Sequence, residues 1–172
     1  MTKRLASILV ALVALSLVAV AWPVARPTPA AAQGGSAVTL GVHFSGFFLL
    51  DFSATGVRQV TSFQDPFDPS RGDQTVFRDE LLRNGQVVGH DDGSCTVTDI
   101  VPTDPDPLKL ACQVTFSLPE GQITTQGAAT NNPVKRLAIT GGTGRYTGAY
   151  GEAVLTESGD ETGSLLLNLT RR

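Results

Sequence analysis

Cys95 and Cys112 are the two residues whose spacing most directly predicts chemistry. They lie in two strand-like runs, Ser94–Val101 and Leu108–Leu118, and the Pro- and Asp-rich segment 102–107 between the runs is typical of a loop. If that loop closes a hairpin, the cysteines stand opposite each other with both sulfurs facing inward. In an oxidising compartment this geometry predicts a disulfide, and two buried reduced thiols are the alternative.

The other reactive residue types lack the spacing that a metal site or an activated nucleophile requires. His43 and His90 lie in different predicted strands without a second ligand at suitable spacing, so no metal site is expected. Asp65, Asp68 and Asp73 do not have the alternating carboxylates of a calcium loop, and the prolines among them favour a turn. The sequence contains no Gly-x-Ser-x-Gly motif, which leaves a serine hydrolase without support.

Residues 1–32 are predicted to be a signal peptide. Lys3 and Arg4 precede the apolar stretch 5–21, and three alanines, of which Ala32 is the last, supply the small side chains that a cleavage site needs. An uncleaved anchor is the alternative, because about 17 apolar residues reach the lower limit for spanning a bilayer. Cleavage after Ala32 would leave a flexible start at 33–37 and a single domain at 38–172. That domain would be secreted, without a stable membrane span.

The charge balance of the mature chain argues against a nucleic-acid partner. Removing the three basic residues of the leader from the total of 13 leaves 10 against 16 acidic residues, a net charge of about −6. Phosphate binding needs a basic face instead. All 18 glycines follow residue 33, and this Gly- and Thr-rich composition favours short strands and turns over long helices.

The elements that position these residues are predicted to be strands only. The segment 38–52 alternates as one long strand, or as two with a bend at Gly46, and one face would carry Val38, Leu40, Val42, Phe44, Phe48, Leu50 and Phe52. Eight to ten strands without a credible helix indicate an all-β sandwich or barrel. The remaining predicted runs are Val57–Phe63, Thr75–Leu82, Gln86–His90, Gln122–Gln126, Arg136–Thr140, Tyr150–Glu157 and Ser164–Thr170.

Three segments together carry a resemblance to a known family. The glycine-rich stretch Ala138–Glu152 resembles the signature shared by allene oxide cyclases and plant dirigent proteins, and the segments 72–95 and 114–127 are similar to earlier parts of the same fold. The resemblance covers about Gly72 to Glu157. It implies an eight-stranded antiparallel β-barrel with an apolar interior.

The glycine-rich stretch is also interpretable from its residues alone. Its glycines exclude a helix, so a strand that enters a tight turn and leaves as a bent strand is the economical interpretation. A phosphate-binding loop is not supported, since no Gly-Lys-Ser/Thr is present and no helix follows. The predicted structural turn residues are Gly141, Gly142, Gly144, Gly148 and Gly151.

The resemblance implies a site without a cofactor. In allene oxide cyclases, a few polar groups inside the barrel guide ring closure of an unstable epoxide. Cys95 matches the pocket cysteine of that family, and Asp79 falls where the plant enzymes have a pocket asparagine. Asp79 is therefore the candidate acid or base, with the reservation that Asp79 and Glu80 face opposite ways if both lie in a strand, so only one can point inward.

Eight apolar and aromatic residues are the candidate pocket lining, and Tyr146 and Tyr150 among them could instead close the barrel end. A hydrophobic small molecule is the predicted partner, bound and held in one conformation in the manner of dirigent proteins. A cofactor-free cyclase or isomerase is the first alternative, and a barrel plugged by its own side chains is the second. Relatives that form dimers or trimers imply self-association. The candidate lining residues are Phe44, Phe48, Val97, Leu110, Val114, Phe116, Tyr146 and Tyr150.

Overall fold

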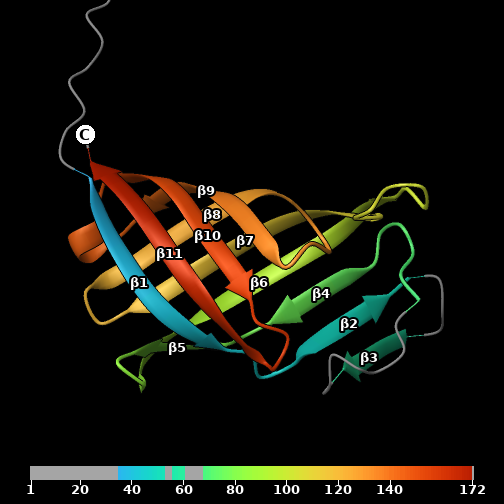
Figure 1. Ribbon diagram of the computed structural model, residues 1–172, viewed down its shortest axis with the longest axis horizontal. Coiled ribbons are helices and arrows are strands. Elements are labelled where there is room, and N and C mark those ends of the chain that lie inside the picture. Colours follow the sequence, from blue (N-terminus) through green and yellow to red (C-terminus); the bar gives the residue numbers. More distant parts are fainter. Residues whose placement is uncertain (1–34, 53–55, 61–67, 172) are drawn as a thin grey trace, which may run out of the picture. The chain divides into compact units, whose positions relative to one another are not determined.

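The structure is a computed structural model that describes residues 35–52, 56–60 and 68–171 (Figure 1). All of these residues belong to one of the two compact units of the chain, the unit at 31–172. The predicted signal peptide lies outside the described residues. No helix in the described part has the length and apolar character that a membrane crossing needs.

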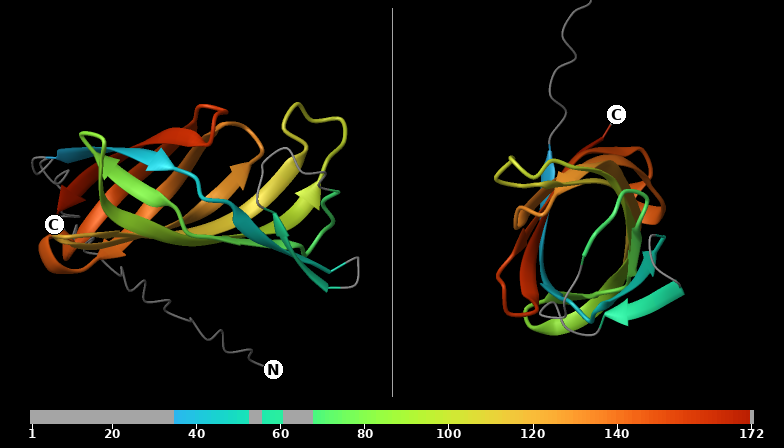
Figure 2. Two further views of the ribbon diagram at one scale, coloured as in Figure 1. Left: turned by 90° about the horizontal axis from the view of Figure 1, so that it is seen from below. Right: turned by 90° about the vertical axis from the view of Figure 1, so that its right-hand side faces the viewer.

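Eight antiparallel strands close a barrel, as the family resemblance implies, whereas the strand pattern alone leaves a sandwich open. The pairing runs from β1 through β11, β10, β9, β8, β7, β6 and β5 back to β1, and a view nearly along the barrel shows the ring closed (Figure 2). The strands of the ring are β1 (Ser36–His43), β5 (Glu80–Arg83), β6 (Gln86–Ile100), β7 (Leu108–Leu118), β8 (Gly121–Thr130), β9 (Val134–Gly142), β10 (Ala149–Glu157) and β11 (Thr162–Arg171).

Three further strands extend the sheet beyond the ring at one end. They are β2 (Phe47–Asp51), β3 (Gly56–Val60) and β4 (Gln74–Phe77). β4 pairs with β6 and β2, and β2 pairs with β3. The β1–β11 pairing ends at His43 and Thr162, so β2 leaves the ring where β11 begins. The barrel therefore opens on the side of β2.

The predicted bend at Gly46 is present, but it changes which residues face inward. Gly46 has φ 92°, a conformation that glycine adopts without strain. The bend shifts the alternation by one residue, so that Leu49 is fully buried and Phe48 is 49% exposed. The expectation that Phe48 shares the inward face of β1 is therefore wrong.

Two other strand boundaries differ from the sequence expectation. The predicted runs 86–90 and 94–101 form a single strand, β6, because its backbone pairs with β7 without a break from His90 to Val97, across the predicted gap. The predicted run 75–82 is instead divided into β4 and β5 by Arg78 and Asp79. The divided strand lies directly beside the continuous one.

The predicted hairpin and its disulfide are confirmed. Cys95 and Cys112 are bonded to each other and stand opposite in the β6–β7 register. The alternation of β7 is also confirmed, since Cys112, Val114 and Phe116 are buried inside the barrel. A disulfide that closes a loop of this length stabilises a fold by about 3 kcal/mol in the chain-entropy model.

The glycine-rich segment joins β9 to β10 and closes the opposite end of the barrel. A short 3-10 turn, η1 (Gly144–Tyr146), follows β9 and buries the Tyr146 ring. Gly144 has φ 58° and lies against the β7–β8 turn, where the Arg145 amide donates to the Glu120 carbonyl oxygen at 2.8 Å. Arg83 of β5 contacts Glu120 at 3.0 Å at the same end. A backbone hydrogen bond and a salt bridge therefore both stabilise this end of the barrel.

Gly144→Ala should lower the free energy of unfolding by about 2 kcal/mol, because the new Cβ adds a positive-φ penalty to a clash with the backbone. A Cβ at Gly144 would lie 2.5 Å from the Glu120 carbonyl oxygen. Gly148 has φ 73° but no heavy atom within 4 Å of an added Cβ, so Gly148→Ala should cost only about 1 kcal/mol. Urea denaturation of both variants measures the difference, and equal losses would contradict this account of the turn.

Candidate functional site

The barrel interior holds a cavity of about 480 Å³, so side chains do not fill it. Its wall includes five of the predicted lining residues, one directly after β1 and the others from β6 and β7. The cavity also contacts Phe47 and Phe77, which the sequence analysis did not single out. The five predicted residues that line it are Phe44, Val97, Leu110, Val114 and Phe116.

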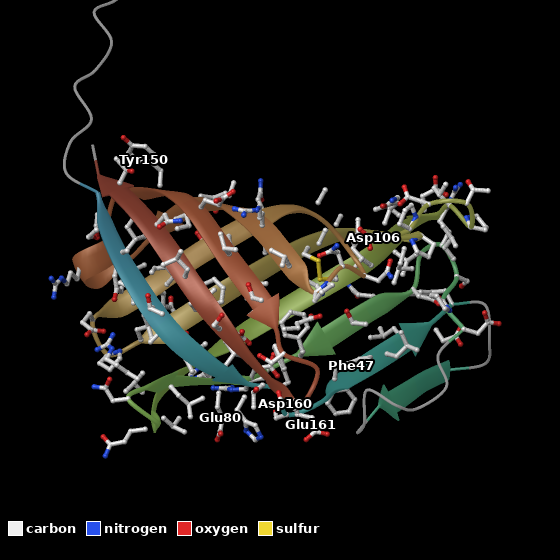
Figure 3. All side chains as sticks on the ribbon, viewed as in Figure 1. Phe47, Glu80, Asp106, Tyr150, Asp160 and Glu161 are labelled. Carbon is white, nitrogen blue, oxygen red and sulfur yellow. A yellow bond between two sulfur atoms is a disulfide. The ribbon has the colours of Figure 1, made fainter. Side chains whose placement is uncertain are left out.

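Three predicted lining residues lie elsewhere. Phe48 faces outward because of the bend at Gly46. Tyr146 is buried in the closed end, and Tyr150 is 41% exposed on the outside of β10 (Figure 3). Their even spacing does not put the two tyrosines on one face, because the 3-10 turn interrupts the strand alternation between them.

Asp79 points inward and its neighbour Glu80 points outward. Asp79 is 4% exposed and faces the cavity from the break between β4 and β5. Glu80 projects from the outer surface, where one of its carboxylate oxygens lies 3.2 Å from His43 Nδ1 (Figure 3). Of the two adjacent acids, only Asp79 can meet a molecule in the cavity.

A second acid, Asp91, accompanies Asp79 in the cavity wall. It is also 4% exposed, and its Oδ1 accepts a hydrogen bond from the Asp79 amide at 3.0 Å. The Asp91 amide donates in turn to the Asp79 carbonyl oxygen at 3.0 Å, and the Ser45 amide donates to Asp79 Oδ1 at 3.0 Å. The sequence analysis missed Asp91, although this residue has the same parity in β6 as Cys95 and therefore faces the same way.

Both carboxyl groups bind protons more tightly than an ordinary aspartate. Burial raises the pKa of Asp79 to about 6, against smaller lowering effects of the Ser45 amide and of His43. Burial, followed by the charge of Asp79, raises the pKa of Asp91 to about 7. The pair therefore retains protons at a pH at which an exposed aspartate is fully ionised.

An ion pair lies at another part of the cavity wall, on β9 and β10. Lys135 Nζ is 2.7 Å from Glu157 Oε2 and donates to the Asn132 carbonyl oxygen at 2.6 Å. Both Lys135 and Glu157 line the cavity. The charge of Lys135 is therefore already balanced within the protein.

The disulfide forms part of the same wall. Cys95 and Cys112 both line the cavity, and their sulfur atoms form a disulfide, so neither residue carries a free thiol. Cys95, which the sequence resemblance aligns with the pocket cysteine of allene oxide cyclases, thus has no thiol proton to donate. Among the residues that the structure describes, no cluster of three or more His, Cys, Asp or Glu side chains could hold a metal ion.

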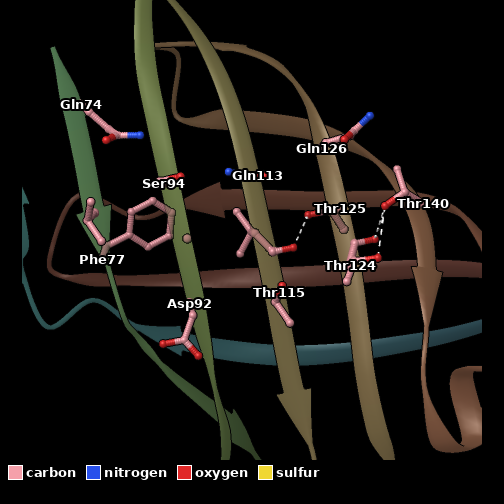
Figure 4. A pocket seen from close by; sticks show the side chains of 13 residues that line it. Gln74, Phe77, Asp92, Ser94, Gln113, Thr115, Thr124, Thr125, Gln126 and Thr140 are labelled. Atoms are coloured by element: carbon pink, nitrogen blue, oxygen red, sulfur yellow. Dashed lines mark hydrogen bonds between the residues drawn. The ribbon is translucent and has the colours of Figure 1, made fainter. Parts of the chain in front are cut away.

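A second concavity, of about 530 Å³, lies on the outer face of β4 and β6–β9 (Figure 4). Its side chains are mostly polar, and several bond to their own neighbours. Thr124 Oγ1 lies 3.1 Å from Thr140 Oγ1, and Thr125 Oγ1 donates to the Val114 carbonyl oxygen at 3.0 Å. This surface collects none of the candidate acids, so the interior cavity is the stronger candidate site.

Comparison with solved structures identifies the same barrel in several proteins. A pyocyanin demethylase has 27% identity and a TM-score of 0.64, over 78% of this chain and 100% of that one. The Diels-Alderase AbmU from Streptomyces koyangensis has 15% identity and a TM-score of 0.56, over 80% and 69% of the two chains. The pterocarpan synthase dirigent protein GePTS1 has 16% identity and a TM-score of 0.55, over 89% and 99%. The last two likenesses concern the fold alone.

The sequence comparison defines the family. The chain matches no curated protein sequence. It does match the family described as the allene oxide cyclase barrel like domain, over residues 54–167. With the closed eight-stranded barrel and the strand order given above, this match shows that the chain belongs to the allene oxide cyclase-like barrel family.

Proposed function

We propose that the barrel binds an apolar small molecule in its interior and exchanges a proton with it through Asp79 and Asp91. One observation carries this proposal: two buried carboxyl groups face a cavity that is otherwise mostly apolar and that side chains leave unfilled. A barrel plugged by its own side chains would lack this space.

The cavity suits a ligand of moderate size. Its volume of about 480 Å³ lies within the range typical of small-molecule pockets. Each 100 Å² of apolar ligand surface removed from water contributes about 2.5 kcal/mol to the gross binding energy. Four phenylalanine residues line the cavity, and they are Phe44, Phe47, Phe77 and Phe116.

The carboxyl pair suits proton transfer near neutral pH. A protonated carboxyl group can donate to an epoxide or carbonyl oxygen, while the ionised partner can accept a proton released elsewhere on the ligand. Acid–base catalysis works best when the pKa lies close to the working pH, and pKa values of about 6 for Asp79 and about 7 for Asp91 would suit a reaction near neutral pH. The net reaction would then be an isomerisation or a cyclisation.

The named relatives support small-molecule chemistry without selecting a substrate. Their names refer to a demethylase, a Diels-Alderase and a dirigent pterocarpan synthase, three different transformations. Binding that only steers a ligand's conformation is the second candidate function, favoured by the phenylalanine-rich lining. The disulfide supports export of the mature domain, because such bonds persist in oxidising compartments.

Filling the cavity should abolish binding. Ala129 of β8 lines the cavity, and Ala129→Phe should lower the affinity for an interior ligand at least tenfold while the protein still folds. Ala111 of β7 is exposed on the outside of the barrel, so Ala111→Phe is the matched control and should bind normally. Calorimetry against a panel of apolar metabolites measures both affinities. Equal loss, or no loss, in the two variants would place the ligand outside the cavity.

Removing either acid should abolish turnover and leave the binding of a neutral ligand within a few-fold of the wild type. Asp79→Asn and Asp91→Asn keep the shape of the side chain but cannot exchange a proton. Glu80→Gln is the control, because Glu80 is next to Asp79 and faces outward. Mass spectrometry of each protein with the metabolites it binds measures turnover. Binding without turnover by the wild type would favour the steering function.

The stability of the fold should report the buried acids without any ligand. The pKa values of Asp79 and Asp91 rise from 3.8 to about 6 and about 7, so the native state holds more protons than the unfolded state in that range. Their contribution is therefore complete below about pH 4 and is lost as the pH rises to about 7. Asp91→Asn should reduce this loss by roughly 2 to 4 kcal/mol.

Urea denaturation between pH 4 and pH 8 measures this effect, with Glu152→Gln as the control. Glu152 is an outward-facing acid of β10 that pairs with Arg136 on the surface. A wild-type profile that matches the Asp91→Asn profile across this range would show that the pair is not buried as described.

A further inference from the structure

We propose that the ligand is an apolar organic cation, whose protonated or quaternary nitrogen pairs with Asp79 and Asp91. The inference rests on the proposed function, interior binding, and adds the charge of the ligand to it. It follows from the charged groups that line the cavity, where acidic side chains outnumber basic ones.

Four charged residues line the cavity, and only two of them cancel. Lys135 and Glu157 form an ion pair with each other at 2.7 Å. Asp79 and Asp91 line the same cavity, and within the described residues neither of them forms an ion pair. The wall therefore carries two acids without a cationic partner.

The cations on neighbouring elements are already paired on the outer surface. His43 of β1 contacts Glu80 of β5 at 3.2 Å. Asp92 of β6 has Arg78 at 3.6 Å and His90 at 3.3 Å. His43 lowers the pKa of Asp79, but this effect is smaller than that of burial. None of these side chains lines the cavity, so they do not compensate the carboxyl groups from inside.

A buried carboxylate without a positive partner is costly, and the protein meets this cost in two ways. Backbone amides of Ser45 and Asp79 each donate to one carboxylate oxygen. The rise of both pKa values means that protons neutralise part of the charge near neutral pH. A cationic ligand would take over the role of these protons.

The aromatic lining suits the same ligand. The face of a phenyl ring attracts a cation, most strongly where water is excluded. Phe44, Phe47, Phe77 and Phe116 share the cavity with the two acids. A neutral ligand would gain only burial there, and an anionic ligand would meet repulsion from Asp79 and Asp91, since Lys135 is already occupied by Glu157.

Two probes of nearly equal size and shape test the charge. N-methylquinolinium is a permanent cation, and 1-methylnaphthalene is its neutral counterpart. At pH 8 the cation should bind the wild type at least tenfold more tightly than the neutral probe. Its affinity should fall at least fivefold from pH 8 to pH 5, as both carboxyl groups become protonated, while that of 1-methylnaphthalene should not fall.

Variants assign the effect to the acids. Asp79→Asn and Asp91→Asn should each remove most of the preference for the cation and retain the neutral probe, whereas Glu80→Gln should keep the preference. If these variants fail to fold, proton release by the wild type supplies the test. At pH 6.5, calorimetry in buffers of different ionisation enthalpy should show that N-methylquinolinium displaces protons and that 1-methylnaphthalene does not.

Three other results would contradict either the charge of the ligand or its binding inside the barrel. If 1-methylnaphthalene binds as tightly as the cation, and Ala129→Phe abolishes both, interior binding stands and the charge inference is wrong. If neither probe binds the folded wild type, with the cation at millimolar concentration and 1-methylnaphthalene at its solubility limit, interior binding fails and the inference falls with it. If Ca²⁺ or Mg²⁺ alone raises the melting temperature through Asp79 and Asp91, the partner is a metal ion and not an organic cation.

Discussion

The hydrogen-bonded junction of Ser45, Asp79 and Asp91 is the constraint on which the opening of the barrel depends. Asp79 accepts from the Ser45 amide, and Asp79 and Asp91 exchange further bonds through their own amides. These bonds join the bend between β1 and β2, the break between β4 and β5, and the unbroken strand β6. Two strands can therefore leave the ring at this point while the sheet stays continuous, and the two acids of the junction face the interior cavity.

The acids of this junction affect both the stability of the fold and the protonation of the cavity wall. Acids that close a strand break at a protein surface would be solvated, whereas these two are buried and hold protons near neutral pH. The Cys95–Cys112 disulfide joins β6 to β7 in the same cavity wall. Burial of the two ionisable acids lowers the free energy of unfolding near neutral pH, and the nearby disulfide offsets part of this loss.

The sequence alone predicts the regular parts of the barrel and misses its irregular ones. The alternation of β7 and the pairing of Cys95 with Cys112 follow from a strand period of two, which holds wherever the strand is straight. Phe48 was misplaced because a bend at Gly46 changes the parity. Asp91 was missed because residues 91–93 were assigned to a gap between strands, although parity with Cys95 indicates its direction. The Lys135–Glu157 pair depends on the β9–β10 register, which local sequence patterns do not determine.

The closed end of the barrel has a kinetic consequence. The turn around Gly144 and the buried Tyr146 ring seal the side opposite β2. A ligand bound as we propose would therefore enter and leave on the side of β2. It would have to leave before the next ligand could enter, so its residence time would limit the rate at which a second is admitted.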